Sequence, residues 1–187
     1  MIRSRSVWHL AAGTCLGLWL FPSRVSAQRL LAGEWSLDKT KSELSGRMRT
    51  NAASIDQTLR IIVDSVNVCV ATYTAGGPFG RTETTERFIA DSVERAFQPE
   101  ERVDSRASTG YRSARWQPNE RQMLVTELIS REIGGQRYAA RNTHTWQLSA
   151  NTDTLVITSL TQGARGTIPT RRVFVRGSGR AQPKCAT

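Results

Sequence analysis

Hydrophobic and polar residues alternate along most of the chain after residue 33. Within residues 58–64, Leu59, Ile61 and Val63 occupy every second position, and residues 66–73 repeat the pattern. Successive side chains of a β-strand point to opposite faces of a sheet, so a period of two indicates strands with one buried face. The short polar pair between the two segments predicts a turn, and therefore a β-hairpin.

The same unit of strand and turn recurs about every ten residues as far as residue 176. We count about eight to nine strands, which predicts an all-β domain built as an antiparallel meander. Closing such a sheet into a barrel removes its unpaired edges, so a barrel is the preferred architecture and a two-sheet β-sandwich is the alternative. In residues 41–53, Leu44 and Met48 have helical spacing but Gly46 interrupts them, and we expect a loop with a helical turn.

The first 27 residues have the pattern of a cleavable secretory signal. Arg3 and Arg5 provide a basic start, residues 10–21 are predominantly apolar, and Val25-Ser26-Ala27 offers the residues that signal peptidase accepts before its cut. The apolar stretch is shorter than the roughly 20 residues that span a bilayer, so a membrane anchor is the less favoured interpretation. We expect a secreted or periplasmic protein with no integral membrane contact after cleavage. The predicted organisation is a signal peptide over 1–27, one barrel domain over 28–176 and a flexible tail over 177–187.

The chain carries a formal net charge of +10, and nearly all of its basic residues are arginines. An excess of positive charge favours anionic partners. The arginines are spread along the chain between acidic residues, however, whereas nucleic-acid-binding proteins gather basic residues on one face. We therefore expect a solvated basic surface, no nucleic-acid partner and a monomer.

Two cysteines, Cys69 and Cys185, lie after the predicted signal. In an oxidising compartment an even pair is expected to be bridged. A bridge between them would pin the C-terminal tail to an early strand, and the chain-entropy model gives a loop of this length about 4 kcal/mol of stabilisation.

The sequence offers few residues for catalysis or metal binding. His144 is the single histidine after residue 27, and no cysteine or carboxylate pair lies at ligand spacing, so we expect no metal site, no cofactor and no enzyme. A serine hydrolase would need His144 as its sole base, and the chain has no Gly-x-Ser-x-Gly elbow. Because His144 alternates with Trp146 and Leu148, an inward-facing, hydrogen-bonded histidine is favoured. Glu83 and Glu86 are an odd number of residues apart, so they cannot share one face of a strand as paired catalytic acids.

The two ends of the predicted barrel carry the most specific residues. Gly33-x-Trp35 opens the first strand, and Arg172, Phe174 and Arg176 share one face of the last. These ends resemble the calycin superfamily, which includes the lipocalins and the fatty-acid-binding proteins. The resemblance implies a lipocalin-like barrel whose closed end is plugged by the tryptophan, with an arginine of the last strand across its ring. The stretch Gly33-x-Trp35-x-Leu37-Asp38-x-x-Lys41-Ser42 also resembles small secreted bacterial β-proteins of unassigned function.

The segment Arg172-Val173-Phe174 is similar to the Arg-x-Tyr ending of fatty-acid-binding proteins, in which the arginine meets a ligand carboxylate. Phe174 lacks the tyrosine hydroxyl, so one contact to a carboxylate would be missing. The alternative is that the aromatic residues fill a core and that Arg172 is a solvated charge. The candidate ligand-binding residues are Trp35, Tyr111, Trp116, Trp146, Arg172 and Phe174.

These patterns predict a small-ligand-binding barrel that takes an apolar or amphipathic ligand and does no catalysis. The alternative function is a structural or interaction domain with a filled core, whose arginine-rich outer face binds an acidic envelope component or polymer. A barrel of about eight strands is compatible with both, because its interior either holds one small ligand or is filled by its own side chains.

Overall fold

Ten antiparallel strands follow one another along the chain. The computed structural model describes residues 29–44, 54–76, 80–99, 106–118, 121–164 and 166–178. The strands are β1 Gly33–Leu37, β2 Asp56–Asp64, β3 Asn67–Ala75, β4 Thr82–Ile89, β5 Arg95–Phe97, β6 Arg106–Trp116, β7 Gln122–Ile133, β8 Gln136–Leu148, β9 Thr154–Gly163 and β10 Gly166–Arg176. The predicted signal peptide lies outside the described residues, as does most of the predicted tail, and within them no helix is long and apolar enough to cross a membrane.

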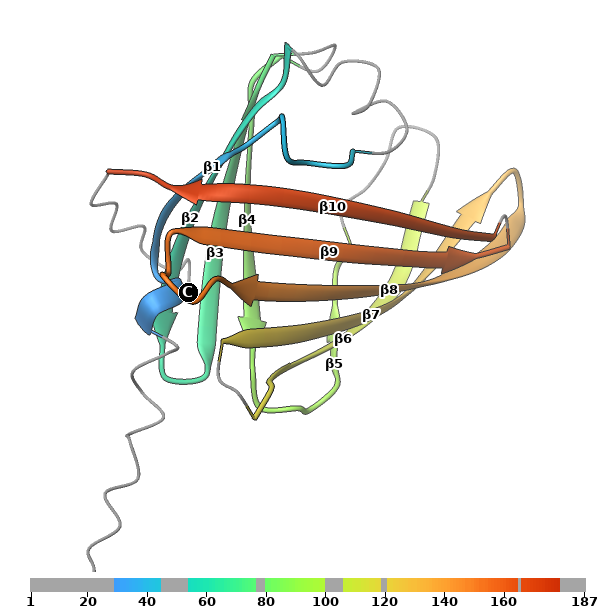
Figure 1. Ribbon diagram of the computed structural model, residues 1–187. Coiled ribbons are helices and arrows are strands. Elements are labelled where there is room, and N and C mark those ends of the chain that lie inside the picture. The colour runs from blue at the N-terminus through green and yellow to red at the C-terminus, as the bar shows by residue number, and fades with distance from the viewer. Residues whose placement is uncertain are drawn as a thin grey trace, which may run out of the picture.

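All ten strands belong to one sheet, in the order β4-β3-β2-β1-β10-β9-β8-β7-β6-β5. Every pair of sheet neighbours is also consecutive in the chain except β1 and β10, while β4 and β5, which are consecutive in the chain, lie at the two edges of the sheet. At the junction of β1 and β10 the sheet turns sharply, so that β1 to β4 cross the direction of β6 to β10 and the sheet curls around an interior (Figure 1). The predicted all-β antiparallel barrel is confirmed, with ten strands where about eight to nine were counted. A sandwich would have required two separate sheets.

The alternation of the sequence sets which face is buried. Leu59 and Ile61 of β2 are buried, and so are Val68 and Val70, which lie on the paired strand β3. Val66, predicted to belong to the same row, is exposed because it stands in the turn between the two strands. Burying such side chains contributes roughly 1.5–3 kcal/mol each, which is enough to fix the register of each strand.

Trp35 and Arg176 close one end of the interior, as the calycin resemblance implied. The guanidinium of Arg176 lies 4.2 Å from the ring centroid of Trp35, which is fully buried and donates a hydrogen bond from Nε1 to the Leu31 carbonyl (2.9 Å). Arg176 also donates to the carbonyls of Ala32, Leu30 and Thr152. One residue therefore holds the start of β1, the end of β10 and the turn before β9.

Gly33 is needed at this position. A Cβ atom there would approach the Nη1 atom of Arg176 to 2.8 Å, and its backbone has a φ of +140°. Side chains rarely adopt that conformation, and none fits beside the guanidinium. The Gly-x-Trp pattern thus has a physical cause, because glycine leaves the space through which the arginine reaches the indole.

The rest of the opening motif forms a turn that binds β10. Asp38 accepts hydrogen bonds from the backbone and hydroxyl of Thr40, and these bonds, with those from Lys41, lower the pKa of Asp38 to about 2. Ser42 Oγ accepts a 2.9 Å hydrogen bond from the Val173 amide and donates to the Asp38 carbonyl. The expected helical turn lies largely in residues 45–53, outside the described part of the chain.

We expect Arg176→Ala to lower the free energy of unfolding by about 2 to 4 kcal/mol. The change removes a cation–π contact and leaves three carbonyls, two of them part-buried, without their charged donor. Equilibrium unfolding in urea measures the effect. Arg141→Ala is the matched control, since Arg141 is exposed on the outer face, and an equal loss in both variants would contradict a closing role for Arg176.

Candidate functional site

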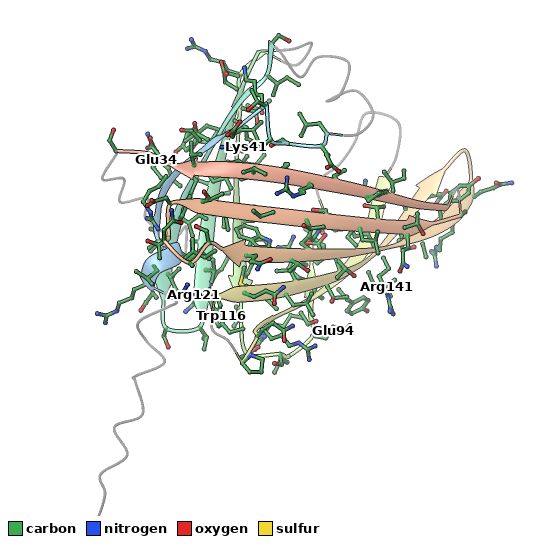
Figure 2. The ribbon with its side chains drawn as sticks, in the orientation of Figure 1. Glu34, Lys41, Glu94, Trp116, Arg121 and Arg141 are labelled. Atoms are coloured by element: carbon green, nitrogen blue, oxygen red, sulfur yellow. The ribbon has the colours of Figure 1, made fainter. Side chains whose placement is uncertain are left out.

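The inner face of the sheet is divided into two zones. Around Trp35 it is apolar, and we call this zone the apolar floor; it comprises Trp35, Leu59, Ile61, Val68, Phe88, Trp146, Leu155, Ile157 and Phe174. Farther along the same inner rows the side chains become polar, and side chains from both halves of the sheet extend into the space between them (Figure 2). We call this second zone the polar belt; it comprises Gln57, Thr74, Glu86, Arg112, Glu127, Asn142, His144, Ser159 and Arg172.

Arg112 of β6 is the most highly connected residue of the polar belt. It donates to Glu127 from Nε (2.7 Å) and to Glu86 from Nη2 (2.7 Å). Its guanidinium also stacks over the rings of Phe88 and Phe97, at 4.6 and 4.1 Å from their centroids. With two carboxylates and two aromatic rings around it, this charge is fully compensated within the protein.

The same contacts hold the two edges of the curled sheet together. Strands β4 and β5 end the strand order. In the described residues one isolated backbone bridge, between Asp91 just after β4 and Arg115 of β6, joins this edge to β6. Arg112 crosses this seam to reach Glu86 and Phe88 on β4. Closure of the barrel therefore depends on side chains where backbone hydrogen bonds are few.

Glu127 is ionised inside the protein. Burial by itself would raise the pKa of Glu127, but contact with His144, the charge of Arg112 and a hydrogen bond from Asn142 outweigh it and lower the pKa to about 2. The carboxylate thus joins neighbouring strands while keeping its charge. A buried carboxylate remains charged only when such partners replace its hydration.

His144 joins Glu127 to Ser159 on the next strand. Its Nε2 atom lies 3.6 Å from the Glu127 carboxylate, and its Nδ1 atom lies 2.7 Å from the Ser159 hydroxyl. The predicted inward, hydrogen-bonded histidine is what the structure shows. The side chains of Ser159, His144 and Glu127 lie in a row. Ser159, however, contacts Nδ1 of the histidine, and the carboxylate is too far from Nε2 for a strong hydrogen bond.

Arg172 differs from Arg112 in having no acid beside it among the described residues. Its Nη1 donates a 3.3 Å hydrogen bond to the side-chain oxygen of Gln57, and Gln57 in turn donates to Thr74 (3.3 Å). Within the described part of the chain no carboxylate lies within ion-pair distance of Arg172; Glu86 acts on it only from farther away and is already paired with Arg112. Burial lowers the pKa of Arg172, and the residue as a whole is half-buried.

Five of the six predicted ligand-binding residues fall into three groups. Trp35, Trp146 and Phe174 belong to the apolar floor, where Trp146 makes an edge-to-face contact with Phe88. Arg172 belongs to the polar belt. Trp116 packs against the floor at one end of β6, and its buried Nε1 has no hydrogen-bond partner among the described residues (Figure 2).

The interior position predicted for Tyr111 is wrong. Its side chain is 44% exposed, and it alternates with the inward-facing Arg112 along β6. The aromatic composition of this segment suggested an inner residue, but the parity of the strand assigns the inside to Arg112.

Sequence reasoning missed the charged residues of the polar belt. Glu127 interrupts an inner row of apolar residues formed by Met123, Val125 and Ile129, and this interruption is visible in the sequence. Arg112 likewise lies in the inward-facing row of β6 that contains the buried Ala114. A charged residue at an inner position of a strand was therefore an available signal.

Two further predictions concern cysteines and metals. Cys69 is disulfide-bonded, but Cys185 lies outside the described residues, so their pairing stays a prediction. In the described ranges no three His, Cys, Asp or Glu residues are grouped in a way that could hold a metal ion.

Comparison with known proteins supports the fold. No protein-family model matches the sequence, and no curated protein matches it. Among solved structures, zebrafish ileal bile acid-binding protein complexed with cholic acid is similar, with a TM-score of 0.50 and 14% identity over 79% of this chain and 99% of that one. At this identity the similarity establishes a calycin-type fold and nothing finer. The resemblance to bacterial β-proteins stays a prediction.

Glu127 should make stability depend on pH. Its pKa is lower in the folded protein than in the unfolded chain, so its contribution is complete above about pH 4.5 and is lost as the pH falls towards 2. We expect Glu127→Gln to cost about 3 kcal/mol of unfolding free energy at pH 7 and less at lower pH. Urea unfolding from pH 7 to 3 measures this difference. Glu132→Gln, at an exposed site on the same strand, is the control, and a difference that does not shrink with pH would contradict the assignment.

Proposed function

We propose that the protein binds a small amphipathic carboxylate inside the curled sheet. The acid group would meet Arg172, and the apolar part would lie towards the apolar floor. The observation that carries this proposal is the charge of Arg172, which faces the interior with a neutral amide as its hydrogen-bond partner.

A guanidinium on the inner face needs compensation for the water it has lost. Arg112 obtains that compensation from Glu86 and Glu127, whereas Arg172 has one 3.3 Å bond to Gln57. A ligand carboxylate would supply the missing charge and accept two hydrogen bonds in the planar geometry that arginine favours. Such a bond would also be strong, because little water competes for it.

The surroundings of Arg172 suit an amphipathic ligand. Phe174, the next inward residue of β10, belongs to the apolar floor, and the Arg172 guanidinium lies 6.0 Å from its ring centroid. Polar and apolar contacts are thus available side by side along one strand. The zebrafish bile acid-binding protein, which shares the fold, was solved in complex with cholic acid, and this supports the idea that such a sheet holds an amphipathic acid.

The proposal includes export and the absence of catalysis. The predicted signal peptide and the disulfide at Cys69 support an oxidising, extracytoplasmic location. The geometry around His144 supports a structural role, since Ser159 contacts Nδ1 and the Glu127 carboxylate lies 3.6 Å from Nε2.

Binding of decanoate and decanol to the wild type and to Arg172→Gln tests the proposal. We expect the variant to bind decanoate about 10- to 100-fold more weakly, which corresponds to losing a hydrogen bond to a charged group, and to bind decanol as before. Isothermal titration calorimetry gives both dissociation constants. Arg141→Gln removes the same charge from the outer face and should change neither.

Equal decanoate affinity in the wild type and Arg172→Gln would overturn the proposal, and so would a wild type that binds neither compound. If the wild type instead binds heparin in a salt-sensitive way, with an affinity lowered by Arg141→Gln, the interaction-domain function would replace it.

A further inference from the structure

We propose that Ser159 selects, among amphipathic acids, those that carry a hydrogen-bond donor such as a hydroxyl group near the carboxylate. This inference rests on the proposed function, because it concerns the ligand held by Arg172. It follows from the order of donors and acceptors along the polar belt from Arg112 to Ser159.

The surroundings of His144 determine which of its ring nitrogens carries the hydrogen. Arg112 and Asn142 donate to Glu127, so this side chain is an ionised acceptor. The carboxylate faces Nε2 of His144 at 3.6 Å. A negative charge at that distance favours a proton on Nε2 over a lone pair there, because two acceptors would repel each other. In the neutral imidazole the hydrogen therefore resides on Nε2, and Nδ1 is an acceptor.

The hydroxyl of Ser159 is then the donor in its hydrogen bond with His144. Its oxygen lies 2.7 Å from Nδ1, and since Nδ1 is the acceptor, Ser159 must be the donor. A hydroxyl has one hydrogen and two lone pairs. With its hydrogen committed to His144, Ser159 offers the interior lone pairs alone, and only a group with its own hydrogen can bind to them.

Ser159 and Arg172 lie near each other on paired strands. Ser159 is paired with Thr170 across β9 and β10, and Arg172 is the next residue of β10 on the same face. Diagonal neighbours of this kind lie within reach of long side chains. Arg172 can only donate and Ser159 can only accept, so the two make opposite demands on one ligand.

An acid with a hydroxyl group two carbons from its carboxyl group meets both demands. Its carboxylate accepts from Arg172, and its hydroxyl donates to Ser159. A keto group at the same carbon presents lone pairs to the lone pairs of Ser159, and burying that unmatched pair is unfavourable. The site is thus expected to distinguish two ligands of nearly equal size and apolarity.

The test compares decanoate, 3-hydroxydecanoate and 3-oxodecanoate by calorimetry at pH 8. We expect the wild type to bind the hydroxy acid about tenfold more tightly than the oxo acid. Ser159→Ala should bring this ratio close to one, with its own decanoate affinity as the reference for both substituted acids. Thr158→Val removes a hydroxyl from the adjacent, outward-facing position of β9 and should keep the wild-type ratio.

Exchanging the acid at position 127 gives a second, independent readout. In Glu127→Gln the amide can donate to Nε2, which moves the imidazole proton to Nδ1 and makes Ser159 accept from it. The serine hydrogen is then free, so the preference should shift towards the oxo acid. Far-ultraviolet circular dichroism checks that this variant is folded before binding is measured.

The outcomes separate the two proposals. If the wild type binds decanoate through Arg172 but takes both substituted acids equally, or if Ser159→Ala keeps the tenfold ratio, the inference about Ser159 is overturned and the proposed function remains. If decanoate affinity does not depend on Arg172, the proposed function itself fails.

Discussion

Compensation of buried charge is the constraint on which this structure depends. In the part of the chain that the structure describes, Arg112 and Arg172 both lie in the polar belt on the inner face of one curled sheet, where an unpaired charge is costly. Arg112 is held by Glu86 and Glu127, which are supplied by the strands on either side of the seam. Arg172 has a neutral amide in place of an acid. The protein thus compensates the charge of Arg112 with its own carboxylates and leaves the charge of Arg172 to be compensated by a ligand.

The two arginines also have different roles, one in the structure and the other in the proposed binding. Arg112 crosses the seam between β4 and β6, where the sheet has a single backbone bridge, so its ion pairs replace ladder hydrogen bonds that closure would otherwise need. Arg176 has the corresponding structural role at the closed end, over Trp35. In the described part of the chain, the side chain of Arg172 makes one hydrogen bond, to Gln57 of β2, and no ion pair. Its substitution is therefore expected to affect binding more than folding.

The sequence predicted the architecture better than the site. Alternation assigned Leu59 and Ile61 to the buried face, because this signal arises from local strand geometry. The closed end at Trp35 was indicated by the resemblance of Gly33-x-Trp35 to the calycins. The alternation of side chains along β6 places Tyr111 on the outer face, although its aromatic character is typical of an inner residue. The partners of Arg112 come from strands that are distant in sequence, and pairing across a seam cannot be read from periodicity.

The state of Arg172 in the presence of a ligand tests this account most directly. Nuclear magnetic resonance of the arginine Nε–H groups, assigned with Arg172→Lys and Arg112→Lys variants, reports on both guanidinium groups during a titration with decanoate. We expect the Arg172 signal to shift and saturate with the dissociation constant measured by calorimetry, while the Arg112 signal stays in place. Saturation of the protein with decanoate without a shift at Arg172 would contradict the account.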